Sequence, residues 1–109
     1  IQTHSRWELP LKFIVLFEDN PQASPDTRAT HMPDHLRFLQ ANADKVQAAG
    51  PLSSVDAAAA GGAWLVEADN EAEVDSLITE DPLWSTGLRA GVRILVWNQV
   101  FANGQTLID

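Results

Sequence analysis

Two patterns of hydrophobic and polar positions alternate along the chain, and together they predict six secondary-structure elements. Short apolar runs rich in β-branched and aromatic residues are typical of strands, and apolar residues spaced by three and four positions predict helices. The strands are expected at residues 12–17, 52–55, 63–68 and 92–97. The helices are expected at residues 28–49 and 70–80. This order is that of a ferredoxin-like βαββαβ fold of the α+β class, with both helices on one face of an antiparallel sheet.

The first predicted helix begins near Asp26 or Thr30, because either side chain can cap an N-terminus. Its apolar face consists of residues at helical spacing, namely Leu36, Leu39, Ala43 and Val46. Pro33 is expected in the first turn, which tolerates a residue without a backbone N–H, and His35 then lies about one turn into the helix. Gly50, which precedes a proline, is expected to end the helix.

The second predicted helix has a clear beginning and end. Asn70 is a favourable N-cap, and Glu73 three positions later completes a variant of the capping box. Its apolar face is formed by Val74, Leu77 and Ile78. Asp81-Pro82 is typical of a helix end. The remaining segments are expected to be a flexible hairpin connection at residues 56–62, a loop at 83–91 and a tail at 101–109.

Length, charge and composition exclude several classes of function. The 109 residues correspond to one domain at residues 11–109, which we expect to follow an N-terminal extension at residues 1–10. A formal net charge of −8 disfavours nucleic acid as a partner, because phosphate backbones are also negative. No apolar run approaches the roughly 20 residues of a membrane span, so no membrane partner is expected. The absence of cysteine excludes thiolate metal sites and agrees with the cytoplasmic location that we expect.

The predicted strands are apolar on both sides, which has a consequence for assembly. Two helices on one face of the sheet would leave the other face exposed to water. A second copy of the chain is the simplest cover for such a face. The sequence therefore predicts a homodimer, or a higher homo-oligomer, packed sheet against sheet.

His35 is the main candidate for chemistry. Histidine side chains change charge near pH 6.5, so a positioned one can act as a general acid or base at neutral pH, although a helix-surface or interface role is the alternative. Arg28 is either an exposed charge or a clamp for a carboxylate or phenolate, because a guanidinium binds anions in a bidentate manner. Ser54 could donate a hydrogen bond in the same cleft, and Trp84 could lie over a substrate ring.

A metal site is the competing interpretation of the histidines. His31 and His35 have the spacing by which two imidazoles on a helix can share one metal ion, with Asp34 between them. The sequence offers no third ligand at a recognisable spacing, and Pro33 can keep His31 outside the regular helix. It also has no glycine-rich phosphate loop between a strand and a helix. We therefore expect no metal and no cofactor, and a small-molecule substrate as the partner.

Five short motifs resemble, in order and spacing, those of the YCII-related (YciI-like) family. They are Arg28, His35-Leu36, Gly50-Pro51-Leu52, Asp81-Pro82 and Gly87. The resemblance runs from Lys12 to Trp97. It implies the dimeric α+β barrel fold, which agrees with the predicted topology. Members of this family are thought to use a histidine and an aspartate in a cleft as an acid/base pair. A few remove HCl from a chlorinated hydroquinone, and the related muconolactone isomerases share the fold.

Carried to this chain, the resemblance implies that the catalytic pair is His35 and Asp81. Asp56 competes with Asp81 for this role, because it follows the segment after Gly50-Pro51 and could line the same cleft. Many relatives have an arginine where this chain has Met32, and His31 or Arg28 could supply the missing positive charge. The implied function is a cofactor-free lyase of the dehydrochlorinase type, or an isomerase, acting on a small cyclic or aromatic-derived anion. The alternatives are a dimer that binds a small molecule without chemistry, and a domain that docks a different protein on its open sheet face.

Overall fold

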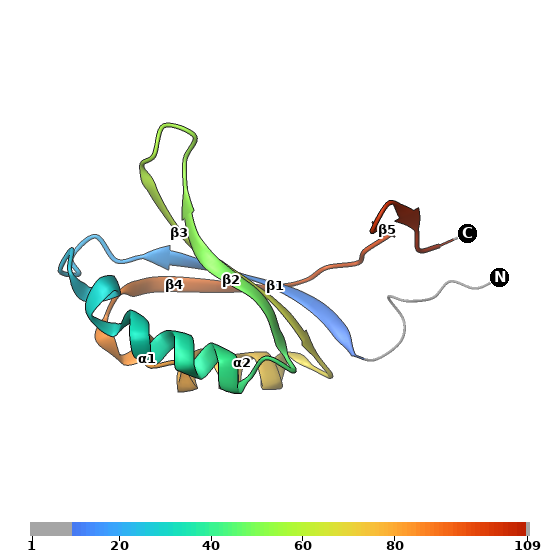
Figure 1. Cartoon of the computed structure of the whole chain (residues 1–109), viewed down its shortest axis with the longest axis horizontal. Helices are drawn as coiled ribbons and strands as arrows, with labels where there is room; N and C mark the ends of the chain where they lie inside the picture. Colours follow the sequence, from blue (N-terminus) through green and yellow to red (C-terminus); the bar gives the residue numbers. More distant parts are fainter. Residues whose placement is uncertain (1–9, 109) are drawn as a thin grey trace.

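The computed structural model describes residues 10–108, which form an antiparallel sheet with helices on one face (Figure 1). The elements are β1 (Leu11–Asp19), α1 (Thr27–Ala41), β2 (Val46–Ser53), β3 (Ala59–Ala68), α2 (Glu71–Glu80), η2 (Trp84–Thr86), β4 (Arg89–Val96), β5 (Phe101–Ala102) and β6 (Gln105–Thr106). This order confirms the predicted ferredoxin-like fold. The expected extension at residues 1–10 lies outside the described residues, apart from Pro10. Neither helix in the described part is long and apolar enough to cross a membrane.

The four main strands lie in the order β2-β3-β1-β4, and every neighbouring pair is antiparallel. β1 is central because it pairs with β3 on one side and with β4 on the other. Phe13, Val15 and Phe17 are buried at alternate positions of β1, as the two-residue period of a strand requires. These three side chains belong to the core cluster, and they mark the sheet face that the helices cover.

The two helices contribute unequally to the core. α2 buries Val74, Leu77 and Ile78, the apolar face that the sequence predicts. Within α1, every residue of which is described, only His35 is buried, and Phe38 and Leu39 pack against the core while remaining partly exposed. A polar side chain thus occupies the most buried position of α1. Because buried polar groups are nearly always hydrogen-bonded, this position requires a partner from elsewhere in the fold.

The predicted end of the first helix is wrong. α1 ends at Ala41, and Asn42 occupies the C-cap, where its side-chain amide donates to the carbonyl of Phe38 at 2.9 Å. Val46 then begins β2, so Gly50-Pro51 lies within a strand instead of ending a helix. The apolar spacing across this region matches a helix face by chance. The side chain of Asn42 bonds one of the last carbonyls of the helix, that of Phe38, and the helix ends at this point.

The beginning of α1 also differs from the prediction. Asp26 occupies the N-cap position, but its side chain makes no capping hydrogen bond. The helix begins at Thr27, so Pro33 lies in the second turn and His35 in the third. Leu36, predicted to face the core, is 54% exposed, because the neighbouring histidine takes the inward position.

The N-terminus of α2 confirms the predicted capping box. Asn70 Oδ1 accepts the backbone N–H of Glu73 at 3.0 Å. The carboxylate of Glu73 reaches back to accept the backbone N–H of Asp69 at 2.9 Å. Two backbone donors that the helix cannot satisfy internally are thereby paired, which fixes where α2 begins.

β2 and β3 form a hairpin that is longer than predicted and extends beyond the rest of the sheet (Figure 1). Its turn comprises residues 54–58, so the expected flexible connection at 56–62 is mostly strand. Gly61 lies where β3 leaves β1, with φ +89°, and a Cβ there would be 2.0 Å from the carbonyl oxygen of Phe17. Only glycine tolerates both this backbone conformation and this approach.

Two segments predicted as irregular contain regular structure. Residues 83–91, expected as a loop, include η2 and the beginning of β4. The expected tail at 101–109 contains the β5–β6 hairpin. Its turn is Asn103-Gly104, with φ values of +53° and +76°, the pair of residues that a two-residue hairpin turn favours.

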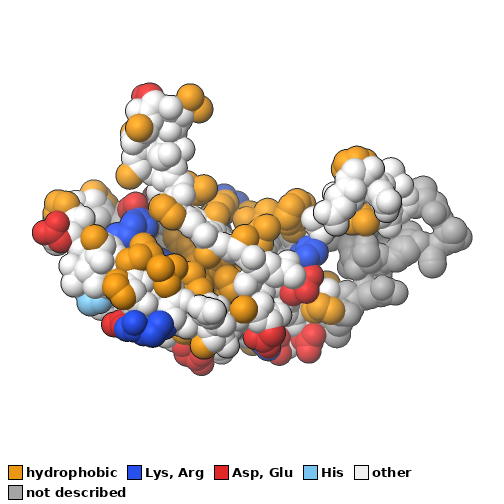
Figure 2. Space-filling view, in the orientation of Figure 1, with side chains coloured by type: hydrophobic (Ala, Val, Ile, Leu, Met, Phe, Trp, Pro, Cys, Tyr) orange, Lys and Arg blue, Asp and Glu red, His pale blue; other side chains and the backbone are white. Residues whose placement is uncertain are grey.

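The sheet face turned away from the helices is apolar and uncovered in the protomer. Leu65, Ile14 and Leu95 are register neighbours across β3, β1 and β4, and none of them is buried. Trp97, just after β4, is 38% exposed. Figure 2 shows hydrophobic side chains along the hollow between the projecting hairpin and the C-terminal segment. The predicted partner copy would cover this open sheet face.

Candidate active site

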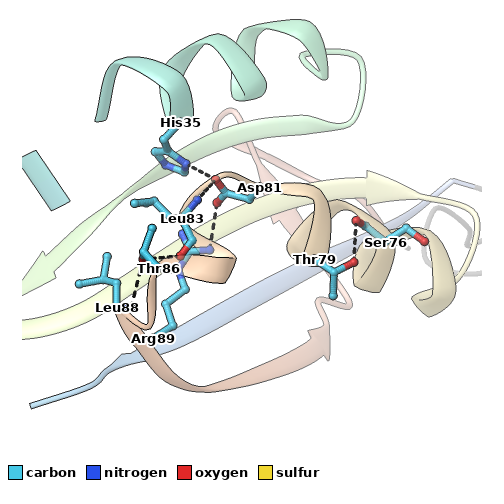
Figure 3. A network of polar contacts seen from close by, with 8 residues as sticks. All are labelled: His35, Ser76, Thr79, Asp81, Leu83, Thr86, Leu88 and Arg89. Atoms are coloured by element: carbon cyan, nitrogen blue, oxygen red, sulfur yellow. Dashed lines mark hydrogen bonds and ion pairs between the residues drawn. The ribbon is translucent and has the colours of Figure 1, made fainter. Parts of the chain in front are cut away.

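His35 and Asp81 meet in the interior of the protein although they are far apart in sequence (Figure 3). Nδ1 of His35 lies 2.8 Å from Oδ1 of Asp81. Both residues are buried, with 7% and 2% of their surface exposed. His35 is the inward residue of α1, and Asp81 is the C-cap of α2. Packing of both helices on one face of the sheet therefore creates the contact.

Asp81 accepts hydrogen bonds on both carboxylate oxygens. Besides His35, the backbone N–H of Leu83 donates to Oδ1 at 3.0 Å, and Nη1 of Arg89 donates to Oδ2 at 2.9 Å. Burial alone would raise the pKa of the Asp81 carboxyl, but the hydrogen bond from His35, the Leu83 amide and the charge of Arg89 hold this pKa below its ordinary value. Asp81 is therefore an anion at neutral pH.

The ionised state of Asp81 determines which nitrogen of His35 carries the proton. An ionised carboxylate only accepts hydrogen bonds, so Nδ1 of the neutral imidazole is the protonated nitrogen. Nε2 then keeps its lone pair. Because His35 also lines the cleft described below, this arrangement gives the cleft a fixed imidazole base with a buried anion behind it.

Arg89, the first residue of β4, holds the other side of the Asp81 carboxylate. Its side chain is only 6% exposed, and its Cζ lies 3.8 Å from the ring centre of Phe17 and 5.6 Å from that of Trp64. A cation over aromatic faces is stabilised by the ring quadrupole. Burial lowers the pKa of the Arg89 guanidinium and the charge of Asp81 opposes this, so the two groups form a buried ion pair.

The segment between α2 and β4 turns sharply, which returns the chain to the carboxylate. Asp81 has extended backbone angles (φ −65°, ψ 129°), as a residue before a proline favours, and Pro82 follows it. The hydroxyl of Thr86 closes the turn by donating one hydrogen bond of 2.7 Å and accepting another of 3.2 Å. Gly87 ends η2 with φ +81°. Two residues later Arg89 reaches Asp81.

A small cleft of about 90 Å³ opens beside His35. Part of its apolar lining comes from Met32, Leu36, Leu39, Phe17, Pro51 and Trp64. Its other charged residues are Asp19, Arg28 and Arg89. Apolar walls with a few converging polar groups are typical of small-molecule sites. The cleft thus has the composition of a small-molecule site.

Arg28 lines the cleft, as predicted, but it already has an anionic partner. Its Nη2 donates to Oδ1 of Asp19 at 2.8 Å. The two side chains are 29% and 28% exposed, so water reaches this pair. Arg28 and His35 are therefore brought to one cleft, while the charge of Arg28 is partly neutralised there.

The other predicted site residues are not brought to the cleft of their own protomer. Ser54 and Asp56 are exposed in the turn of the β2–β3 hairpin, where they are hydrogen-bonded to each other. Trp84 is 38% exposed in η2 and does not line the cleft. His31 is half-buried on α1 and is also outside the lining. The protomer thus does not bring these four side chains to its cleft, and a binding role for them stays a prediction.

Among residues 10–108, no three histidine, aspartate or glutamate side chains gather into a group that could hold a metal ion. Nδ1 of His35 is occupied by Asp81, and the carboxylate of Asp34 contacts Arg37. In the described part of the chain, His31 and His35 are thus not joined by a third side chain that could complete a metal site.

Sequence reasoning missed Arg89 and Asp19. Asp19 follows the first predicted strand closely, and Arg89 lies in the segment at 83–91 that is expected to be a loop. A single arginine between Leu88 and Ala90, directly before an apolar strand, was the available signal. A cation in such a position needs an anion, and Asp81 is the acid that the preceding turn places opposite it.

The fold and the site together define a ferredoxin-like α+β protein with a buried histidine–aspartate pair beside a small cleft. A family model described as the YCII-related domain matches residues 11–98, so the chain belongs to the YCII-related family. This match confirms the resemblance that the motifs indicate. Among curated proteins, none matches the sequence.

Solved structures similar to this chain include an enzyme. The 5-chloro-2-hydroxyhydroquinone dehydrochlorinase TftG from Burkholderia phenoliruptrix AC1100, in complex with 2,5-dihydroxybenzoquinone, is 25% identical with a TM-score of 0.68, over 82% of this chain and 95% of that chain. A protein from Arabidopsis thaliana is 12% identical with a TM-score of 0.53, over 88% and 93% of the two chains. A dimeric ferredoxin-like protein of unknown function from Bacteroides fragilis is 15% identical with a TM-score of 0.48, over 80% and 93%.

Proposed function

We propose that this protein is a cofactor-free acid/base enzyme of lyase or isomerase type, with His35 as the proton-transferring group and Asp81 as its orienting partner. The observation that carries the proposal is the 2.8 Å contact between Nδ1 of His35, which lines the cleft, and Oδ1 of the buried Asp81. The likeness to a dehydrochlorinase supports elimination of HCl from a ring as the reaction. The proposed substrate is a small cyclic or aromatic-derived anion.

The proposed chemistry needs a positioned base and a group that stabilises the charge which forms on it. In an elimination, Nε2 of His35 takes a proton from the substrate, and the electron pair of the broken bond forms the new double bond as chloride leaves with the pair of the C–Cl bond. In an isomerisation, the imidazolium returns the proton to a different atom. Asp81 stabilises the imidazolium in both cases, because its carboxylate lies against Nδ1.

Chloride release from 5-chloro-2-hydroxyhydroquinone tests the proposal in its dehydrochlorinase form. We expect wild-type protein to release chloride and His35→Ala to lose roughly 10²–10⁴-fold in rate, the usual contribution of a general base. Gln40→Ala is the matched control, because Gln40 is an exposed residue of the same helix. The control variant should retain the wild-type rate.

Three other outcomes are informative. Full turnover by His35→Ala would show that the assignment of the base is wrong. Wild-type protein that releases no chloride would exclude the dehydrochlorinase form, and exchange of substrate hydrogen with deuterated water would then test the isomerase form. A protein that only binds ligand would hold 2,5-dihydroxybenzoquinone with similar affinity in wild type and His35→Ala, and would catalyse neither reaction.

We also propose that the enzyme is a cytoplasmic homodimer formed through the open sheet face. The row of Leu65, Ile14 and Leu95, none of which is buried, supports this, since a monomer would leave it partly in water. Light scattering should give twice the protomer mass for wild type and the protomer mass for Leu95→Glu. The control Gln40→Glu adds the same charge on an exposed helix position and should stay dimeric. A monomeric wild type would contradict this part of the proposal.

A further inference from the structure

Arg89 is a buried cation whose hydrogen-bonding capacity the acid/base pair leaves largely unused. A guanidinium has five N–H donors, and in the part of the chain that the structure describes only Nη1 of Arg89 has a protein acceptor, Oδ2 of Asp81. The side chain is nevertheless only 6% exposed. Buried donors are normally paired, so the unused N–H groups indicate a place where a ligand can supply an acceptor.

The neighbours of Arg89 limit where that acceptor can lie. The ring of Phe17 covers one face of the guanidinium, with 3.8 Å between Cζ and the ring centre, and Trp64 lies at 5.6 Å. The carboxylate of Asp81 occupies one edge of the guanidinium, as Figure 3 shows. Arg89 also lines the cleft beside His35. An oxygen atom that reaches another edge of the guanidinium must therefore approach through this cleft.

The second arginine of the cleft is less suited to binding an anion. Arg28 is held by Asp19 at 2.8 Å, and both members of that pair line the cleft, so an incoming anion meets a carboxylate next to the cation. Asp81, the partner of Arg89, also accepts hydrogen bonds from His35 and from the backbone amide of Leu83. Its negative charge is therefore shared among three donors and neutralises Arg89 less completely. In addition, solvent screens the half-exposed pair more than the buried one.

We propose that Arg89 binds the anionic oxygen of the substrate, a carboxylate, phenolate or enolate oxygen on a single ring, at the floor of the cleft. The ring then lies against the apolar side chains of α1, near Met32 and Leu36, within reach of Nε2 of His35. This inference deepens the proposed function, because it assigns the charge recognition to one residue. It concerns binding alone, so it can fail while the acid/base role of His35 holds, and the reverse is also true.

Calorimetric titration with benzoate and benzamide tests the inference, since the two compounds share size and shape and differ in charge. Wild-type protein should bind benzoate more tightly than benzamide. Arg89→Gln should weaken benzoate binding by roughly 10- to 100-fold, as expected for a lost hydrogen bond to a charged group, and leave benzamide binding nearly unchanged. Arg37→Gln, which removes one positive charge from an exposed position of α1, is the matched control and should keep the preference.

Two further variants make the result decisive. Arg89→Lys keeps the charge without the planar fork, so it should retain part of the benzoate preference, and it remains informative if Arg89→Gln fails to fold. Arg28→Gln should keep the preference in full. The proposal is overturned if wild type shows no preference for benzoate, if Arg28→Gln abolishes the preference instead, or if the Arg89 variants weaken both ligands equally, which a purely structural role would do.

Discussion

Two arginine–aspartate pairs lie beside one cleft of this protein and differ mainly in burial. Arg28, Asp19 and Arg89 line the cleft, whereas the side chain of Asp81 is fully buried. The pair Arg28–Asp19 has its closest atoms 2.8 Å apart, and the pair Arg89–Asp81 has them 2.9 Å apart. The side chains of the first pair are 29% and 28% exposed, whereas those of the second are 6% and 0% exposed. The two ion pairs thus have the same chemistry and almost the same distance, but Arg28–Asp19 is in contact with water and Arg89–Asp81 lies in the interior.

The difference in burial determines what each pair can contribute. Water and salt screen the half-exposed pair, and such pairs typically contribute at most about 1 kcal/mol. In the buried pair each charge has lost its hydration, so each depends on the other, and removing one partner typically costs about 3–5 kcal/mol. Against the effect of burial, the hydrogen bonds from His35 and the Leu83 amide, together with the charge of Arg89, hold the pKa of Asp81 below its ordinary value, so the carboxylate beside His35 is ionised. The distances in the two pairs are nearly equal, so only their burial shows that Arg89–Asp81 stabilises the site more than Arg28–Asp19 does.

The largest effect is expected for Asp81→Ala. This change leaves the guanidinium of Arg89 buried without its anion and removes the acceptor of His35. We expect the free energy of unfolding, measured by urea denaturation, to fall by about 3–5 kcal/mol. A loss below about 1 kcal/mol would mean that burial does not distinguish the two pairs.

A smaller loss is expected for Arg89→Met, which removes the cation and keeps an unbranched side chain of similar length. Asp81 then retains the donors His35 and the Leu83 amide, so one acceptor atom, and not the whole carboxylate, loses its partner. We expect the unfolding free energy to fall by about 1–3 kcal/mol. Arg28→Met is the matched control in urea denaturation, and a control that loses as much as Arg89→Met would contradict the comparison.

The advantage of wild type over Asp81→Ala should depend on pH. The pKa of Asp81 is lowered in the folded protein, so the unfolded chain takes up its proton first as the pH falls. The stabilising contribution is therefore fully present above the ordinary aspartate value near 4 and is lost as the pH falls below it. Urea denaturation between pH 7 and pH 3 should show the two unfolding free energies converging. A constant difference across this range would contradict an ionised Asp81.

The smallest effect is expected for Asp19→Ala, the counterpart of Asp81→Ala in the half-exposed pair. We expect the unfolding free energy to fall by at most about 1 kcal/mol, and this loss should shrink further in high salt because the pair is reached by solvent. Urea denaturation at low and high salt concentration checks both statements. A loss of several kcal/mol that is insensitive to salt would show that the pair behaves as a buried one.

Much of the fold follows from local patterns. The cores of β1, β3 and β4 are apolar runs, and the cap and apolar face of α2 are visible as Asn70, Glu73, Val74, Leu77 and Ile78. The end of α1 is not visible in this way, because Ala43 and Val46 continue a helical spacing while Asn42 ends the helix. Local hydrogen bonding to the backbone thus outweighs periodicity at this point.

The site is only partly predictable for a different reason. His35 and Asp81 could be paired through the family resemblance, and the fold brings them within hydrogen-bonding distance. Arg89 could not be found by spacing, because its partner lies across a turn whose path depends on Thr86 and Gly87. Asp56 follows the segment after Gly50-Pro51, which favours a place in the cleft, but it lies with Ser54 in the turn of the β2–β3 hairpin, outside the cleft lining.

The proposed role of His35 as a base depends most directly on which nitrogen of its imidazole carries the proton. Two-bond ¹H–¹⁵N correlation spectra of ¹⁵N-histidine-labelled protein at pH 8 report which ring nitrogen carries the proton, and His35→Gln assigns the signal. Because Asp81 is an ionised acceptor against Nδ1, the predicted result is a proton on Nδ1 and a free lone pair on Nε2. A proton on Nε2 would contradict the account, since His35 would then present no base to the cleft.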